Sequence, residues 1–244
     1  MPTTAFGLEA VLTHELQKIT FSPEPKKWLG PFVNNCFHYL GVSQGIRNRA
    51  RMCSELVYQA GKKRAACIGN RPLRIESVGC GLSWPVFHAA IRLTRENIPV
   101  ELLLIDRCQS ILDKSAKKAN ALGIAHLVRT EKGEAGDLGK TVGLNFRPDI
   151  TEIMGVAEYL KFLELNKVFR AIFNDLEPGG YLVSGNVRPK TEGLLVYFYL
   201  GWKTLIYRFS WQMRLVTHWS GFRNAGFPRD PHKFFTLIVA QKPK

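Results

Sequence analysis

The alternation of apolar and polar positions changes along the chain and predicts two kinds of segment. From about residue 73 onward, short apolar runs alternate with segments whose apolar residues recur every three or four positions. The runs predict strands over residues 73–78, 100–105, 127–130, 149–154 and 181–187. The intervening segments predict helices over residues 84–96, 110–122 and 158–176. Such alternation is typical of an α/β fold with a parallel sheet and right-handed crossovers.

The two ends of the chain carry different patterns. Residues 1–20 and 44–66 have helical periodicity, with a proline-rich break at 22–31 between them, so residues 1–66 are predicted to form an N-terminal helical cap. After residue 190 an aromatic-rich helical stretch is expected over 194–222, then a turn at 225–227 and a last strand over 234–240. Residues 67–244 are therefore expected to form a Rossmann-like domain with a mostly parallel seven-stranded sheet, helices on both faces and a final antiparallel strand.

Composition supports a folded chain. The 244 residues are 45% hydrophobic, and the longest apolar run, residues 194–200, is far shorter than the roughly 20 residues of a membrane-spanning helix. The N-terminus lacks the pattern of a signal peptide, which favours a cytoplasmic location. Neither the five cysteines nor the six histidines show metal-ligand spacing, so no metal is expected.

The formal net charge of +14 attracts polyanions and anionic surfaces. The basic residues form short clusters spread along the chain, and each cluster is compatible with a solvated face. Nucleic acid is therefore a less favoured partner than a small molecule, and peripheral membrane contact stays open.

The segment with the clearest chemistry directly follows the first predicted strand. It reads SVGCGLS over residues 77–83, and Gly79 and Gly81 permit a tight turn with close approach of a ligand to the backbone. Ser83 is expected to cap the next helix, with Pro85 in its first turn. A dinucleotide-binding loop needs a third glycine, where this chain has Trp84. S-adenosylmethionine has no phosphate, so this loop favours a methyl donor over a nicotinamide.

A carboxylate stands at the end of the second predicted strand. Asp106 follows Gly81 by 25 residues, which suits hydrogen bonding to a ribose diol. A helix cap or a surface carboxylate is the structural alternative. The glycine loop upstream favours the role in binding.

These residues resemble the class I S-adenosylmethionine-dependent methyltransferases over about residues 70–244. The likeness includes VGCG at 78–81, the acid at 106, GEAGDL at 133–138 and PGG at 178–180. The resemblance implies that the loop wraps the methionine part, that the acid holds the ribose and that the GEAGDL segment meets adenine. The residues that it implies for the cofactor are Arg47, Gly79, Cys80, Gly81, Asp106, Arg107, Glu134, Ala135 and Met154.

A narrower likeness concerns one bacterial subgroup of methyltransferases. The runs at 45–49, 155–160, 178–189 and 201–208 are similar to this subgroup, some of whose members are associated with making 3-hydroxy fatty-acid methyl ester signals. Two residues depart from the wider family pattern. Ser77 replaces an acidic residue and Ser83 a glycine, so weaker hydrogen bonding around the loop and lower cofactor affinity are expected.

Arg47 and Arg49 are alternative partners for the carboxylate of a methyl donor, and a solvated pair of arginines is equally compatible with the pattern. The subgroup resemblance favours Arg47. The acceptor is expected near Tyr159, Asn186, Arg188 and Tyr207, although aromatic residues at helical spacing more often belong to a core.

Methyl transfer is an in-line displacement that positioning can catalyse, and a carboxylate acceptor needs no general base, so no catalytic residue is assigned. The sequence also lacks an NPPY-type loop after residue 154 and a cysteine suited to attack a pyrimidine.

We therefore expect a methyl donor and a small apolar acceptor with an oxygen nucleophile, such as a carboxylate or hydroxyl. An RNA methyltransferase and a non-catalytic binding protein of the same fold are the alternatives.

Overall fold

A computed structural model of the chain describes residues 41–189 and 204–244. The predicted helix at 1–20, the break at 22–31 and the beginning of the predicted aromatic stretch at 194–203 lie outside these residues. The helices are α3 (Gly41–Ala65), α4 (Trp84–Arg95), α5 (Gln109–Ala121), α6 (Phe162–Asp175) and α8 (Ser210–Trp219). Three short 3-10 helices are η2 (Ala125–Leu127), η3 (Ala135–Asp137) and η4 (Ala157–Tyr159).

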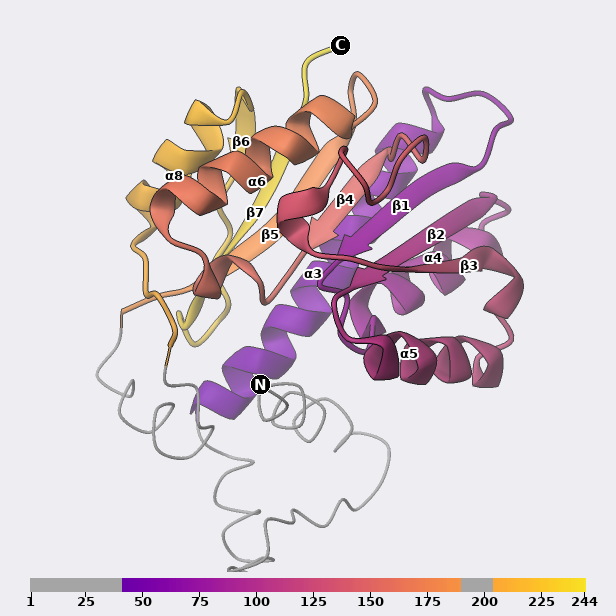
Figure 1. Ribbon diagram of the computed structural model, residues 1–244, viewed down its shortest axis with the longest axis horizontal. Coiled ribbons are helices and arrows are strands. Elements are labelled where there is room, and N and C mark those ends of the chain that lie inside the picture. The colour runs from indigo at the N-terminus through magenta and orange to yellow at the C-terminus, as the bar shows by residue number, and fades with distance from the viewer. Residues whose placement is uncertain (1–40, 190–203) are drawn as a thin grey trace, which may run out of the picture.

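Seven strands form one sheet in the order β3-β2-β1-β4-β5-β7-β6. They are β1 (Leu73–Val78), β2 (Val100–Asp106), β3 (Val128–Lys132), β4 (Ile150–Ile153), β5 (Tyr181–Val187), β6 (Asn224–Gly226) and β7 (Phe235–Gln241). The pairs from β3 to β5 are parallel, whereas β7 runs antiparallel to both β5 and β6. The predicted mostly parallel sheet is confirmed, and the strand order reverses at β1 and β4 (Figure 1).

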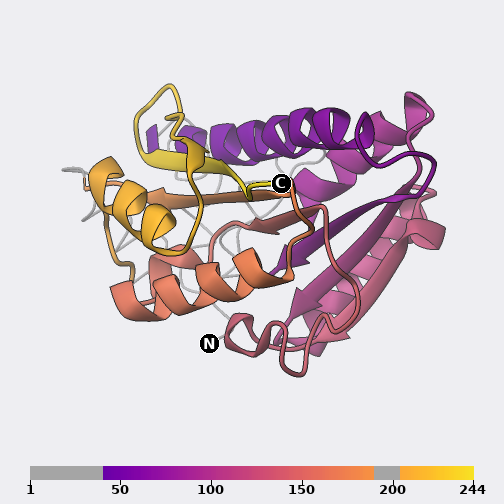
Figure 2. The same cartoon turned by 90° about the horizontal axis from the view of Figure 1, so that it is seen from above.

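Helices cover both faces of the sheet. Figure 2 shows α3 along one face and α6 along the other. The alternation of side chains across each strand explains this arrangement: Leu102 and Leu104 of β2 pack in the cluster that contains α3 and α4, whereas Leu103 and Ile105 pack in the cluster that contains α6 and α8. A strand buried on both faces requires the nearly continuous apolar sequence seen in β2.

The helix predicted over 44–66 is confirmed as α3. Its Ile46, Cys53 and Val57 are fully buried, as their spacing indicates, and α3 contacts α4, β5 and β7. The described part of the predicted cap therefore helps to cover the sheet. The division of the chain at residues 66 and 67 stays a prediction.

The C-terminal region differs from its sequence interpretation. Between residues 204 and 244 helix is confined to α8, and strand β6, which pairs with β7, overlaps the turn expected at 225–227. The predicted helix at 158–176 begins only at Phe162. Residues 157–159 form the short 3-10 helix η4 instead, and the Leu160 carbonyl accepts a hydrogen bond from the Arg208 guanidinium.

Candidate functional site

The loop between β1 and α4 has a backbone that favours glycine at two positions. Gly79 and Gly81 have φ angles of 61° and 51°. A Cβ atom built on Gly79 would lie 2.3 Å from Cγ2 of Val156, whereas one built on Gly81 would meet nothing within 4 Å. Gly79 is therefore required for packing inside the protein. Gly81 instead presents its bare backbone to open space, as a ligand cradle does.

Ser83 closes this loop in a way that the sequence did not predict. It adopts the left-handed conformation with φ 55°, and its side chain makes no cap hydrogen bond to α4. Its N–H instead donates to the Cys80 carbonyl at 2.9 Å. The capping prediction is wrong because a cap residue needs an extended backbone to direct its oxygen to the helix. Pro85 does lie in the first turn, as expected.

Asp106 joins the end of β2 to the glycine loop. One carboxylate oxygen accepts the N–H of Gly81 at 3.2 Å, and the other accepts the N–H of Cys108 at 2.9 Å. The N–H of Cys80 donates to the Ile105 carbonyl at 3.0 Å, which fixes the loop further. Each carboxylate oxygen keeps acceptor capacity for a second hydrogen bond. Asp106 can therefore hold the loop in place and still accept hydrogen bonds from a ligand.

A buried carboxylate from the neighbouring strand contacts Ser77, one of the two residues that depart from the family pattern. Register places Ser77 of β1 opposite Glu152 of β4, and the Ser77 hydroxyl donates to the Glu152 carboxylate. The Cys53 thiol of α3 donates to its other oxygen. Burial raises the pKa of Glu152 to about 7, against the lowering effect of these hydrogen bonds. Glu152 was missed because no sequence pattern reveals which residue a parallel neighbour places beside Ser77.

Arg49 of α3 forms an ion pair in which both side chains are buried. Its Nη1 lies 2.7 Å from Oε1 of Glu158, and both side chains are buried. The guanidinium also stacks 4.5 Å from the centroid of Phe235. Burial raises the pKa of Glu158, and Arg49 opposes that rise. Arg47 is half-buried, and burial lowers its pKa. Its expected contact with the carboxylate of the methyl donor stays a prediction.

Asn186 lies fully buried at the end of β5. Its Nδ2 donates to the Val187 and Ile206 carbonyls, and its Oδ1 accepts from the buried Arg208. All of these partners belong to the protein, so Asn186 holds the segment before α8 against the sheet. Its expected role in acceptor binding stays a prediction.

The other predicted site residues lie near the same edge with different exposures. Arg107 and Glu134 are exposed, whereas Ala135, Met154, Arg188 and Tyr207 are half-buried. Tyr159 is 38% exposed, and desolvation raises its pKa to about 12. Gly79, Cys80 and Gly81 are consecutive in the loop, and the N–H of Gly81 joins this loop to Asp106. The binding roles expected of the remaining residues stay predictions.

The part of the chain that the structure describes was also compared with the requirements of a metal site and of a membrane-spanning helix. Residues 41–189 and 204–244 contain no group of three or more His, Cys, Asp or Glu side chains placed to hold a metal ion. Within the same ranges no helix is both long and apolar enough to cross a membrane.

Comparisons with known proteins indicate the family and the fold. The sequence model of a family described as "Putative methyltransferase" matches residues 22–196. No curated protein matches the chain significantly. Among solved structures, a possible exported protein from Bordetella parapertussis superposes with a TM-score of 0.77 at 20% identity, covering 99% of this chain and 80% of that one.

Two further structures were solved with a cofactor or its product. Magnesium protoporphyrin IX methyltransferase from Synechocystis PCC 6803, with bound S-adenosylhomocysteine, gives a TM-score of 0.57 at 15% identity and covers 82% of this chain and 87% of that one. Human N-acetylserotonin methyltransferase, with S-adenosylmethionine, gives 0.57 at 12% identity over 90% of this chain and 60% of that one. Identities this low show the fold alone. Because the family model matches well over half of the chain, the protein belongs to this methyltransferase family, and its fold is that of the S-adenosylmethionine-dependent methyltransferases.

Proposed function

We propose that this chain transfers a methyl group from S-adenosylmethionine to an oxygen nucleophile on a small apolar molecule. The observation that carries the proposal is the pairing of a bare glycine backbone with a carboxylate. The N–H of Gly81 donates to Asp106, and the space beside the Gly81 Cα is open. A cofactor that carries a ribose diol and no phosphate fits these donors and acceptors.

The residues that would hold the methyl donor follow from this arrangement. The backbone of Gly79, Cys80 and Gly81 would contact its methionine part, and Asp106 would accept hydrogen bonds from its ribose. The wider resemblance adds Glu134 and Ala135 for the adenine. When bound, the donor supplies an electrophilic methyl group on a sulfonium.

The acceptor class is argued from the chemistry of the described residues. Glu152 and Glu158 are buried and already hydrogen-bonded, so neither stands out as a general base. A carboxylate acceptor, ionised near neutral pH, needs no base. Two of the compared methyltransferases are named for small-molecule acceptors, which supports this class. We therefore propose a fatty or otherwise apolar carboxylic acid, in line with the subgroup resemblance.

The donor site is tested by isothermal titration with S-adenosylhomocysteine beside NADH. We expect binding of the first and none of the second. Asp106→Ala should weaken the binding by about tenfold or more, because hydrogen bonds to a charged group are lost. Asp113→Ala, which removes an exposed carboxylate of α5, is the matched control and should bind normally. Binding of NADH alone, or an unchanged affinity in Asp106→Ala, would overturn this site.

The acceptor is tested with S-adenosylmethionine labelled in its methyl group. Incubation with decanoic and 3-hydroxydecanoic acids should give a labelled product that releases methanol in mild base, as an ester does and an ether does not. Label that enters only RNA would show that the acceptor is RNA and not a carboxylic acid. Donor binding without transfer to any extract component would indicate a binding protein.

A further inference from the structure

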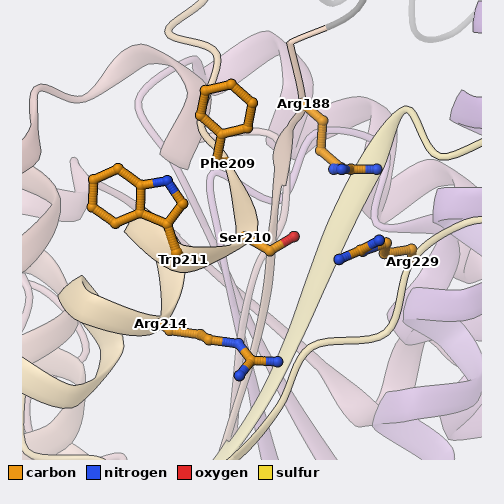
Figure 3. Close-up of a pocket in the computed structure, with 6 residues that line it drawn as sticks. All are labelled: Arg188, Phe209, Ser210, Trp211, Arg214 and Arg229. Atoms are coloured by element: carbon orange, nitrogen blue, oxygen red, sulfur yellow. The ribbon is translucent and has the colours of Figure 1, made fainter.

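A separate pocket lies toward the antiparallel end of the sheet, between the end of β5, the loop before β7 and the beginning of α8. Its volume is about 320 Å³ (Figure 3). The residues that line it are Arg188, Phe209, Ser210, Trp211, Arg214 and Arg229. Arg188 directly follows β5, and Arg229 lies between β6 and β7. In Figure 3 the side chains of Arg188 and Arg229 lie on one side of the pocket and those of Phe209 and Trp211 on the other.

The three guanidinium groups of this pocket have no acidic partner in residues 41–189 and 204–244. Arg188 donates from Nη1 to the Lys233 carbonyl at 3.2 Å, but its Nε is buried without a hydrogen-bond partner. Arg214 stacks 5.2 Å from the centroid of Phe227. Asp230, next to Arg229 in sequence, is buried and accepts the N–H groups of His232 and Phe235 instead.

Two arginines of α3 show the contrast. Arg49 and Arg64 each pair with a buried carboxylate, at 2.7 Å and 2.8 Å. Like charges gathered in one pocket repel each other unless an anion lies between them. Arg214 and Arg229 are exposed and Arg188 is half-buried, so an anion from outside the described chain can reach all three guanidinium groups and offset their repulsion.

The chemistry of the lining selects the class of anion. A guanidinium presents parallel N–H donors that match the two oxygens of a carboxylate or phosphate. The first N–H groups of α8 add positive potential at the same place. Phe209 and Trp211 are 50% and 62% exposed, so an apolar surface adjoins the charged one. Such a lining suits a molecule with an oxyanion at one end and an apolar chain at the other.

We propose that this pocket binds the carboxylate or phosphate group of an anionic ligand through Arg188, Arg214 and Arg229. The ligand contacts Phe209 and Trp211 with its apolar part when it is an amphiphile. The inference goes beyond the proposed function, since binding here requires neither the methyl donor nor the glycine loop.

The test is titration of the full chain with decanoate below its micellar concentration, with inorganic phosphate and with decanol. We expect decanoate to bind, and Arg214→Gln/Arg229→Gln to lose about tenfold or more in affinity for it. The matched control is Arg95→Gln/Arg129→Gln, which removes the same charge from exposed residues of α4 and β3. The control should keep its affinity within about twofold, because diffuse charge contributes little at physiological salt.

Each outcome bears on the pocket. Decanoate that binds more tightly than phosphate supports an amphiphile, and equal affinities support a small free oxyanion, both at the arginines. The proposal is overturned if decanol binds as tightly as decanoate, if the control variant loses as much as the pocket variant, or if none of the three probes binds. Circular dichroism of each variant shows whether it is folded. A failed titration with S-adenosylhomocysteine would refute the proposed function while leaving the decanoate result intact.

Discussion

At the scale of the residue, the backbone conformation of the glycine loop shapes the proposed cofactor site. Gly81 combines a φ of 51° with open space where a Cβ would stand. Gly81→Ala should cost about 1 kcal/mol of stability, because an alanine is strained in the left-handed region. It should also lower the affinity for S-adenosylhomocysteine about tenfold, because the new methyl group enters the space proposed for the cofactor. Chemical denaturation and calorimetric titration measure the two effects.

Gly123 offers a matched control for that substitution. It has a φ of 72° and also nothing within 4 Å of a built Cβ, but it lies after α5. Gly123→Ala should show the loss of stability and keep the affinity. Equal affinities of the two variants would mean that the cofactor does not lie against Gly81.

At the scale of the element, one ion pair ties α3 to the segment that follows β4. Arg49 and Glu158 are 6% and 3% exposed, so the removal of either leaves a charge without compensation in the interior. Arg49→Met should lower the free energy of unfolding by about 3–5 kcal/mol. Arg49→Met/Glu158→Gln should recover much of this loss, because the orphaned charge is gone. Urea denaturation of the variants checks both effects.

Arg47→Met provides the comparison on the same helix. Arg47 is half-buried, so its substitution should cost less stability than that of Arg49. If Arg49→Met is as stable as the native chain, the pair does not join α3 to η4 energetically. If Arg47→Met keeps full affinity for S-adenosylhomocysteine, the predicted clamp on the donor's carboxylate is wrong.

At the scale of the whole molecule, buried acids make stability depend on pH. Glu76 lies in the centre of the sheet, and its Oε1 has no hydrogen-bond partner in the described chain. Desolvation, with a smaller contribution from Asp175, raises the pKa of Glu76 to about 8. The folded state therefore holds a proton that the unfolded state releases near the ordinary pKa of glutamic acid, about 4.3. The stability that this protonated group contributes is fully present below that value and is lost as the pH rises through about 8.

Glu76→Gln isolates this contribution, because the amide stays neutral at every pH. Between about pH 5 and pH 8 the native chain should lose on the order of 1–3 kcal/mol of unfolding free energy relative to Glu76→Gln. Urea denaturation at both pH values gives the difference. Parallel pH dependence in the two proteins would show that Glu76 is not protonated in the folded state.

The strands and the glycine loop could be predicted because their patterns are local. The apolar sequence of β2 and the residues VGCG lie within a few positions of one another, and side-chain alternation with backbone freedom acts over that range. The same reasoning placed Asp106 correctly, since a residue that ends a parallel strand must lie at the edge where the loops gather. It failed for Ser83, whose backbone depends on how the loop closes.

The sequence by itself determined the succession of strands and helices from β1 to β5, the family and the position of the glycine loop. Only the tertiary structure decided which distant side chains meet. Ser77 and Glu152 are 75 positions apart and Arg49 and Glu158 are 109 apart, so no local periodicity links them. The pocket arginines likewise come from separate places: the end of β5, helix α8 and the loop before β7. These contacts follow from strand register and helix packing, which the whole chain sets through the burial of its apolar faces.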